Sequence, residues 1–394
     1  MKRVVCLLIL LLLCVGAAAA QEAENLTGSC AFKLCDTHFK SSMMTDGKYT
    51  SHWRQPEKGR HGWIAASAPE DKDIHSVYVC FAQVPTEWEL QGRRDGEWET
   101  LYRDETGYAH VYIPLAQGER EVRLYITGDE RQQLDINEIF LFGEGEKPDW
   151  VQVWQPTVEK ADILFLSAHP DDELIFFAGG IPTYNTELHK NVVVAYLTFS
   201  NTTRRSELLN GLWSMGVTNY PVIGDFPDKK YNNHAQKMYR YMGGQSKVQA
   251  WVTELYRRYR PEVVVTHDID GEYGHDEHRV AAQTAMDCFT LAADPEKFAA
   301  SAQEYGTWQV KKLYLHLWPE NQIRMNWSEP LDSLGGVTGL EAAERAYAFH
   351  VTQMGSGMSV TETGAEYDNT LFGLAMSTVG ADSEGGDFLE NIPE

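Results

Sequence analysis

Positive charge is scarce in this sequence. Lys and Arg number 34 against 57 Asp and Glu, which leaves a formal net charge of -23 at pH 7. An excess of negative charge repels phosphates, so it argues against nucleic acids and anionic membranes as partners. Polyanionic glycans are mildly disfavoured for the same reason, whereas neutral sugars and amino sugars are compatible with this charge.

Apolar runs long enough to span a bilayer are also lacking. Residues 1–20 have the pattern of a secretory signal peptide: basic residues, then a short apolar stretch, then an alanine run that predicts cleavage before Gln21. We therefore expect an exported protein, periplasmic or secreted, with no transmembrane segment in the mature chain. Lipid attachment at Cys14 is less favoured, because Leu13 is bulkier than the small residue that such processing prefers.

Cysteine is sparse as well. Four cysteines follow the predicted signal, at Cys30, Cys35, Cys80 and Cys288. None has the spacing of a zinc knuckle, and none stands in a catalytic context. An exported compartment permits disulfides, and Cys30 and Cys35 are close in sequence, but their pairing stays open. Cys288 follows an apolar helical pattern, which predicts a buried thiol.

The sequence has no internal repeats and no G-x-G-x-x-G segment after a predicted strand, so a dinucleotide cofactor is not indicated. Its 394 residues exceed what one core usually serves, which predicts two domains. Short alternating segments of β-branched and aromatic residues favour an all-β jelly-roll sandwich at residues 21–147. Two prolines mark a linker at residues 148–157.

Residues 158–394 alternate strands with helices, which predicts an α/β domain with a Rossmann-like, mostly parallel sheet. We expect strands at residues 163–166, 192–197, 221–226, 261–265 and 313–318, and helices at residues 204–215, 249–259, 280–291 and 341–350.

A polar loop, Ser-Ala-His-Pro-Asp-Asp-Glu at residues 167–173, directly follows the first of these strands. In an open α/β sheet, ligands bind beyond the carboxyl ends of the strands. His169 and Asp172 are ligand types that zinc accepts, and Asp171 then remains as an unligated carboxylate. The alternative is an Asp-rich helix start that only caps the helix and offsets its dipole, which leaves His169 without a role.

A second polar cluster at residues 266–278 follows another strand-like run. It contains His275 and His278, which are three residues apart and lie on nearly one face if they begin a helix. Alternatively they are solvated surface histidines. Two such clusters, each after a predicted strand, favour one shared metal site.

These motifs resemble those of the PIG-L/LmbE-like N-acetylglucosaminide deacetylases, whose hallmarks are an AHPDDE loop and a later YGHxxH segment. Both are present, at residues 168–173 and 273–278, and residues 204–208 are similar to a helix of the family. The resemblance covers roughly residues 158–390. It departs at residues 276–277, where Asp-Glu replaces the Pro-Asp of many relatives.

The resemblance implies seven site residues: metal ligands (His169, Asp172 and His278), a general base (Asp171), groups around an oxyanion (His275 and Tyr273) and a substrate contact (Arg204). It also implies one catalytic divalent ion, zinc or another, with open coordination positions. Three functions stay open: an exported zinc-dependent deacetylase of N-acetylated amino sugars or glycoconjugates, a zinc amidase or esterase on another acylated substrate, and a glycan-binding protein with an inactive hydrolase domain. The intact cluster counts against the third.

The N-terminal region resembles the discoidin (F5/8 type C) jelly roll, in segments at residues 46–53, 62–64, 96–98 and 137–140. This implies a galactose-binding-like domain that binds glycan through exposed aromatics, with Trp53, Trp63 and Trp88 as candidates. The alternative is that each tryptophan fills the core of the sandwich.

Overall fold

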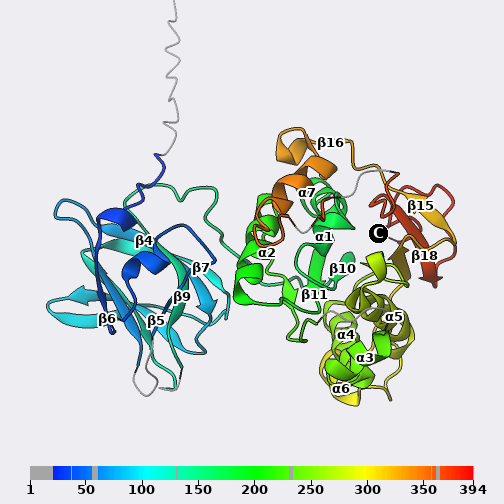
Figure 1. Cartoon of the computed structure of the whole chain (residues 1–394), viewed down its shortest axis with the longest axis horizontal. Helices are drawn as coiled ribbons and strands as arrows, with labels where there is room; N and C mark the ends of the chain where they lie inside the picture. The colour runs from blue at the N-terminus through cyan, green and yellow to red at the C-terminus, as the bar shows by residue number, and fades with distance from the viewer. Residues whose placement is uncertain are drawn as a thin grey trace, which may run out of the picture.

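The structure is a computed structural model that describes residues 21–36, 38–55, 61–129, 132–229, 234–355, 357–360 and 364–393. The predicted signal peptide, including Cys14, lies outside the described residues. Antiparallel sheets form the N-terminal part of the chain, and a mixed sheet with helices forms the C-terminal part (Figure 1).

The N-terminal part is a sandwich of two antiparallel sheets, as the sequence predicts. Its strands are β1 (Ala31–Leu34), β2 (Trp53–Arg54), β3 (Trp63–Ser67), β4 (Ile74–Gln83), β5 (Trp88–Arg94), β6 (Glu97–Arg103), β7 (His110–Glu119), β8 (Glu121–Ile126) and β9 (Asp135–Phe142). One sheet has the order β1-β3-β8-β5-β6 and the other has the order β2-β9-β4-β7. Every second residue of β8 is buried, because alternate side chains face the core between the sheets.

Two of the three tryptophans considered for glycan contact lie in this core. Trp53 is 0% exposed and Trp88 is 1% exposed, and Trp88 packs edge-on against Phe81 with ring centroids 4.9 Å apart. The alternative that these tryptophans fill the core is therefore confirmed, and their role as exposed glycan contacts is wrong. Trp63 is half-buried.

The C-terminal sheet has seven strands in the order β12-β11-β10-β13-β14-β18-β15. Their bounds are β10 (Ile163–Ser167), β11 (Val192–Tyr196), β12 (Val222–Ile223), β13 (Val263–Thr266), β14 (Lys312–His316), β15 (Gln322–Arg324) and β18 (Leu371–Ser377), and β16 (Pro330–Leu331) pairs separately with β17 (Val337–Thr338). The first five strands pair in parallel, whereas β18 and β15 pair antiparallel. The sheet is therefore mixed, and the sequence analysis missed its antiparallel end.

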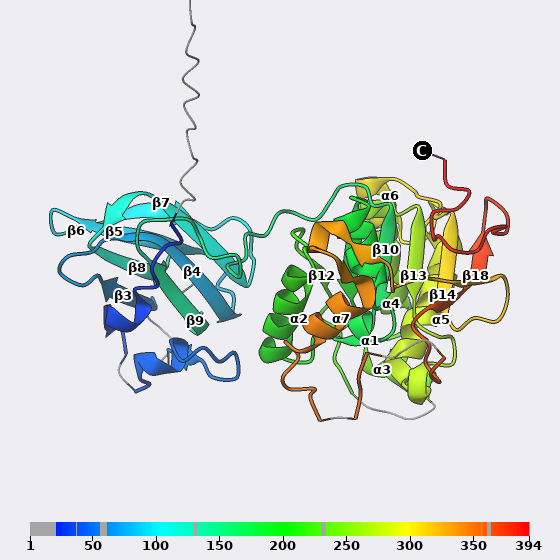
Figure 2. The same cartoon turned by 90° about the horizontal axis from the view of Figure 1, so that it is seen from above.

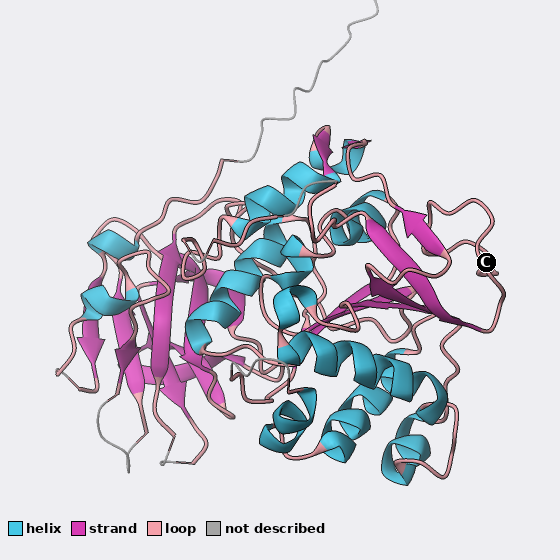
Figure 3. Cartoon of the chain, turned by 45° about the vertical axis from the view of Figure 1, so that its right-hand side comes forward, coloured by secondary structure: helices cyan, strands magenta, loops and turns pink. Residues whose placement is uncertain are grey.

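Helices cover both faces of this sheet (Figure 3). They are α1 (Asp172–Ile175), α2 (Thr202–Ser214), α3 (Ala235–Tyr241), α4 (Gln245–Tyr259), α5 (Asp276–Leu291), α6 (Ala299–Tyr305) and α7 (Gly339–Tyr347). Neighbouring residues of β10 point to opposite faces: Phe165 joins the core under α2 and α7, and Leu164 joins the core under α4 and α5. The helix predicted to begin at Val280 begins at Asp276, as α5. The polar loop at residues 167–173 leads into a helix of a single turn, α1.

Helix α2 joins the two parts of the chain. The Arg205 guanidinium donates to the backbone oxygens of Phe81 and Ala82, at 2.9 and 2.8 Å. Tyr108 of the sandwich stacks on Tyr220 with ring centroids 4.2 Å apart. The helix and the sandwich face each other in Figure 2. The domain boundaries stay predictions.

The predicted linker at residues 148–157 packs against these parts, because its Val151, Gln152 and Trp154 are buried. The four described cysteines form no disulfide with one another. Cys288 is buried as predicted, and burial raises the pKa of its thiol to about 12. Within the described ranges, none of the helices combines the length and the hydropathy that crossing a membrane requires.

Candidate metal centre and active site

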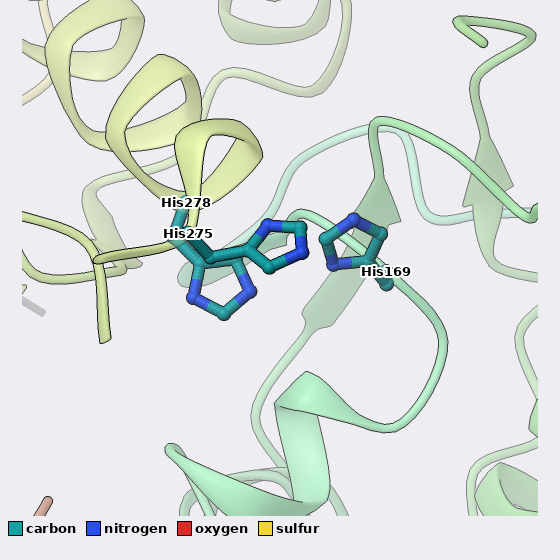
Figure 4. Close-up of side chains that lie close together, drawn as sticks. All are labelled: His169, His275 and His278. Carbon is teal, nitrogen blue, oxygen red and sulfur yellow. The ribbon is translucent and has the colours of Figure 1, made fainter. Parts of the chain in front are cut away.

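The site lies where two adjacent parallel strands, β10 and β13, end. The loop after β10 carries His169, the segment between β13 and α5 carries His275, and the first turn of α5 carries His278. Figure 4 shows the three imidazoles close together. The sequence argument for this position is therefore correct: carboxyl ends of neighbouring parallel strands meet at one edge of the sheet.

Among the three predicted metal ligands, Asp172 lies within contact of both histidines. Asp172 Oδ2 lies 2.9 Å from His169 Nδ1 and 3.2 Å from His278 Nε2. Two ligand atoms on a tetrahedral zinc are about 3.3 Å apart, given Zn–N and Zn–O bonds of about 2.0–2.1 Å. All three residues are at least 95% buried. Their donor types and spacing fit zinc.

The electrostatics of this position also favour a cation. Burial alone would lower the pKa of His278, but the carboxylates of Asp172 and Glu272 outweigh burial and raise it to about 10. Burial raises the pKa of Asp172, yet His278 and His169 hold it well below its usual range. Asp172 is therefore an ionised, buried carboxylate that stabilises positive charge beside it.

Two further histidines have nitrogens near these ligands. Ring nitrogens of His169, His275 and His278 lie within 4.8 Å of one another, and His267 makes a similar group with Asp172 and His278. Both His267 nitrogens are already engaged, since Nε2 accepts from Ala168 N–H at 2.9 Å and Nδ1 lies 3.0 Å from Glu272. His275 is thus the alternative third imidazole ligand.

Asp171 is held beside the ligands without being one of them. Its backbone has φ 105°, a left-handed conformation that is strained for a residue with a Cβ. Its N–H donates to Glu173 Oε2 at 2.9 Å, and its carbonyl accepts from Leu174 and Ile175 at 3.0 Å each, which fixes that conformation. Burial raises the pKa of Asp171 to about 7, although Arg204 lowers it. A carboxylate with this pKa suits proton transfer near neutral pH.

Arg204 contacts this carboxylate directly. Its Nη2 donates to Asp171 Oδ1 at 2.5 Å and to the backbone oxygen of Pro170, and its side chain is mostly buried. It therefore reaches the site, as the resemblance implies. The guanidinium holds Asp171, a role additional to the predicted contact with substrate.

We expect Arg204→Ala to move the acidic limb of the pH–rate profile to higher pH. The resemblance makes Asp171 the general base, which must be ionised to accept a proton, and loss of the guanidinium raises its pKa. A rise of one pH unit reduces the rate on the acidic limb about tenfold. Arg204→Lys retains the charge and serves as the matched control. If Arg204 binds only substrate, Arg204→Ala raises KM while the acidic limb of the pH–rate profile stays at the same pH. If neither KM nor the acidic limb changes, Arg204 has no role in the site.

Tyr273 and His275 also line the cavity. Tyr273 is 43% exposed, and its hydroxyl lies 3.5 Å from His278 Nε2. Burial raises the pKa of Tyr273 well above its usual value, so the hydroxyl keeps its proton and can donate to an oxyanion. Burial lowers the pKa of His275, whose Nδ1 lies 3.1 Å from Glu277 Oε2. His275 is thus a neutral imidazole near pH 7.

The sequence analysis missed a fully buried carboxylate behind the ligands. Glu272 Oε2 lies 2.8 Å from His278 Nδ1, and Glu272 Oε1 lies 2.7 Å from His316 Nδ1. His267 and the Asp268 N–H complete its contacts. His316 ends strand β14, so the rule that found His169 could have found it too. Glu272 fixes the orientation of His278 and draws the proton of that ring to Nδ1, which leaves Nε2 for a metal.

We expect Glu272→Gln to weaken zinc binding by about 10–100-fold, because the amide keeps the volume but removes the charge that orients His278. Competition with a chromogenic chelator measures the affinity. Asp270→Asn, an exposed change of the same chemistry two residues away, is the control and should bind zinc as the wild type does. Equal affinities for Glu272→Gln and the wild type would contradict this role.

These groups surround one cavity of about 290 Å³. Its lining comprises His169, Asp171, Asp172, Ile175, Arg204, Asp228, Tyr273, His275, Gln353 and Met358. The structure therefore brings six of the seven predicted site residues to one cavity wall, and His278 lies directly behind it, within 3.2 Å of Asp172. The cavity is lined by both acidic and basic groups, which suits a polar substrate.

Comparisons with known proteins agree with the family resemblance. Residues 164–289 match the PIG-L family, described as GlcNAc-PI de-N-acetylase, so the resemblance is confirmed for this part of the chain. A 1D-myo-inositol 2-acetamido-2-deoxy-alpha-D-glucopyranoside deacetylase from Catenulispora acidiphila is 28% identical over 211 residues. That match spans 46% of this chain and 63% of the relative's length.

Solved structures are similar to each part separately. N,N'-diacetylchitobiose deacetylase from Pyrococcus horikoshii has a TM-score of 0.38 and 17% identity, covering 51% of this chain and 74% of its own. A chitosan-binding module of a chitosanase/glucanase from Paenibacillus sp. IK-5 has a TM-score of 0.28 and 20% identity, covering 31% of this chain and all of its own.

Proposed function

We propose, from the match of residues 164–289 to the PIG-L family, that this protein is an exported, metal-dependent hydrolase that removes acetyl groups from N-acetylated amino sugars or glycoconjugates. One observation carries the proposal: a buried Asp172 carboxylate lies within 3.2 Å of two imidazoles, beside an unligated Asp171 whose pKa is about 7. Zinc is the favoured ion.

Each residue then has a chemical task. An amide is a poor electrophile, and a divalent ion held by His169, Asp172 and His278 would supply Lewis acidity toward its carbonyl and toward a water. Asp171 accepts the proton of the attacking water and, once protonated, can return it to the departing amine. The Tyr273 hydroxyl donates to the oxygen that becomes negative, an interaction worth about 3 kcal/mol in other hydrolases.

The amino-sugar substrate rests on the relatives. The Catenulispora relative is named for a 2-acetamido-2-deoxy-glucopyranoside, and this chain spans 63% of its length. The same machinery would serve another acylated substrate. Export rests on the predicted signal at residues 1–20. We also retain the Rossmann-like description for the parallel part of the sheet and the galactose-binding-like description for the sandwich.

Incubation of the purified protein with a panel of acylated compounds tests this function. Mass spectrometry would follow release of acetate and appearance of a free amine. We expect cleavage of N-acetylated amino sugars or their glycoconjugates and no cleavage of O-acetylated sugars that lack an amide. Turnover confined to esters, or to amides without a sugar, would instead favour the general amidase or esterase.

A further inference from the structure

A second cavity, which we name the interdomain groove, lies between the sandwich, the linker and helix α2. Its volume is about 590 Å³, within the range of about 300–1,000 Å³ typical of small-molecule sites. Its lining comprises Gly47, Tyr49, Asp149, Trp150, Gln152, Asn210, Trp213, Ser214, Ala348, Phe349 and Val351. None of these residues has a role in the chemistry proposed above.

Exposed apolar side chains gather at this groove. Eight large hydrophobic side chains are exposed among the described residues, and three of them, Trp150, Phe349 and Val351, line it. Trp150 is 47% exposed although its ring packs edge-on against Phe140, with centroids 4.9 Å apart. The indole is thus held rigidly with one side open. Flat, fixed aromatic faces offer a large contact area at little cost in side-chain entropy.

Polar groups stand beside the aromatic rings. Gln152 Nε2 donates to Asn210 Oδ1 at 2.6 Å, and Trp213 Nε1 donates to the Asp149 backbone oxygen at 2.9 Å. These bonds fix the wall of the groove. The lining contains one charged side chain, the exposed carboxylate of Asp149. The other lining residues are aromatic, small or apolar, or neutral and polar, and Gln152 among them is buried with both polar atoms of its side chain hydrogen-bonded. Such a lining favours a neutral, hydroxyl-rich ligand with apolar faces, which describes a sugar chain.

Two segments of the chain contribute side chains to both the groove and the active-site cavity. Helix α2 contributes Arg204 to the active site and Asn210 to the groove, about 9 Å further along the helix axis. The segment after α7 contributes Phe349 to the groove and Gln353 to the active site. Thr352, between them, is tied to α2 through two hydrogen bonds to Glu207, at 2.7 and 2.8 Å. α2 and α7 lie side by side on the edge that faces the sandwich (Figure 2).

We propose that the interdomain groove binds the further sugars of an N-acetylglucosamine chain whose acetylated end sugar occupies the active-site cavity. This inference rests on the proposed function and names its substrate more closely: an oligomer rather than a single sugar. It also gives the sandwich a part in recognition. That part uses the shared groove and not the core tryptophans Trp53 and Trp88.

Kinetics on a length series of N-acetylglucosamine oligomers, from the monomer to the hexamer, tests the groove. We expect kcat/KM of the wild type to rise with length. Trp150→Ala in the linker and Phe349→Ala in the segment after α7 should each lower kcat/KM on the hexamer about tenfold, mainly through KM, and leave kcat/KM on the monomer unchanged. Tyr241→Ala, an exposed aromatic on the far face of the sheet, is the control and should match the wild type. A wild-type kcat/KM that does not change with oligomer length would contradict the proposed role of the groove. Variants that lose kcat/KM equally on the monomer and the hexamer would contradict it too.

Calorimetry separates this inference from the catalytic one. The hexamer is titrated into Asp171→Asn protein, with and without Trp150→Ala. Binding that weakens about tenfold with Trp150→Ala supports the groove even if no oligomer is hydrolysed, and in that case only the proposed function fails. If the hexamer binds equally with and without Trp150→Ala, or does not bind at all, the proposed role of the groove is wrong, whatever the turnover of the monomer.

Discussion

Asp171→Asn should lower kcat by about 10²–10⁴-fold while zinc content and fold stay intact. The substitution removes a proton acceptor with almost no change in volume, and a general base contributes a factor of about this size. The ligand at Asp172 is untouched, and the amide can still accept from Arg204. Turnover of an N-acetylated sugar, elemental analysis and circular dichroism on the same preparation measure the three quantities.

The matched control for this variant is Asp228→Asn. Asp228 lines the same cavity, with a carboxylate oxygen 3.8 Å from His169 Nε2, but it lacks the buried contact with Arg204. It should keep activity within about tenfold of the wild type, because it has no assigned proton transfer. A near-normal rate for Asp171→Asn together with a severe loss for Asp228→Asn would make Asp228 the base.

His278→Ala should abolish stoichiometric zinc and with it nearly all turnover. The variant removes one of three ligands and leaves the Asp172 and Glu272 carboxylates without the imidazole that lies between them. Loss of a metal ligand has an effect far larger than that of a typical surface change. Elemental analysis after dialysis measures occupancy, and a thermal melt with added zinc reports whether the folded variant still binds the ion.

His275→Ala distinguishes the two possible ligand sets. The set of His169, Asp172 and His278 predicts that His275→Ala retains zinc but turns over more slowly. The alternative set of three histidines predicts that it loses zinc as His278→Ala does. Full occupancy in His278→Ala would contradict both sets.

Much of this site could be predicted because local sequence carries it. The loop at residues 167–173 follows an unbroken apolar strand, and the second cluster follows another, so the sheet-edge rule places both together. His278 lies on the first turn of α5 because this helix begins at Asp276, four residues before the apolar pattern that starts at Val280. Acidic residues at Asp276 and Glu277 extend its start.

Partners that are distant in sequence could not be predicted in the same way. Glu272 was visible in the second cluster, but its contact with His316 joins residues 44 positions apart through the pairing of β13 with β14. The contact between Arg204 and Asp171 likewise depends on how α2 sits over the loop. Register and helix placement, rather than composition, decide such contacts.

The tryptophans illustrate a second limit. The resemblance to the discoidin jelly roll made Trp53 and Trp88 candidates for glycan contact but could not say which face of the sandwich each occupies. Both faced the core, where a large apolar ring gains most from burial. The antiparallel strands β15 and β18 were missed because β15 has only three residues, and β18 is defined by its pairing with β14 and β15, which are distant in sequence.

The central claim is that acetate release depends on a metal held by this cluster. The most direct measurement is acetate release from an N-acetylated amino sugar by wild-type protein, before and after chelation and again after zinc is restored. We predict turnover that chelation abolishes, that zinc restores, and that zinc does not restore in His278→Ala. Undiminished acetate release from fully metal-free wild-type protein would contradict the account.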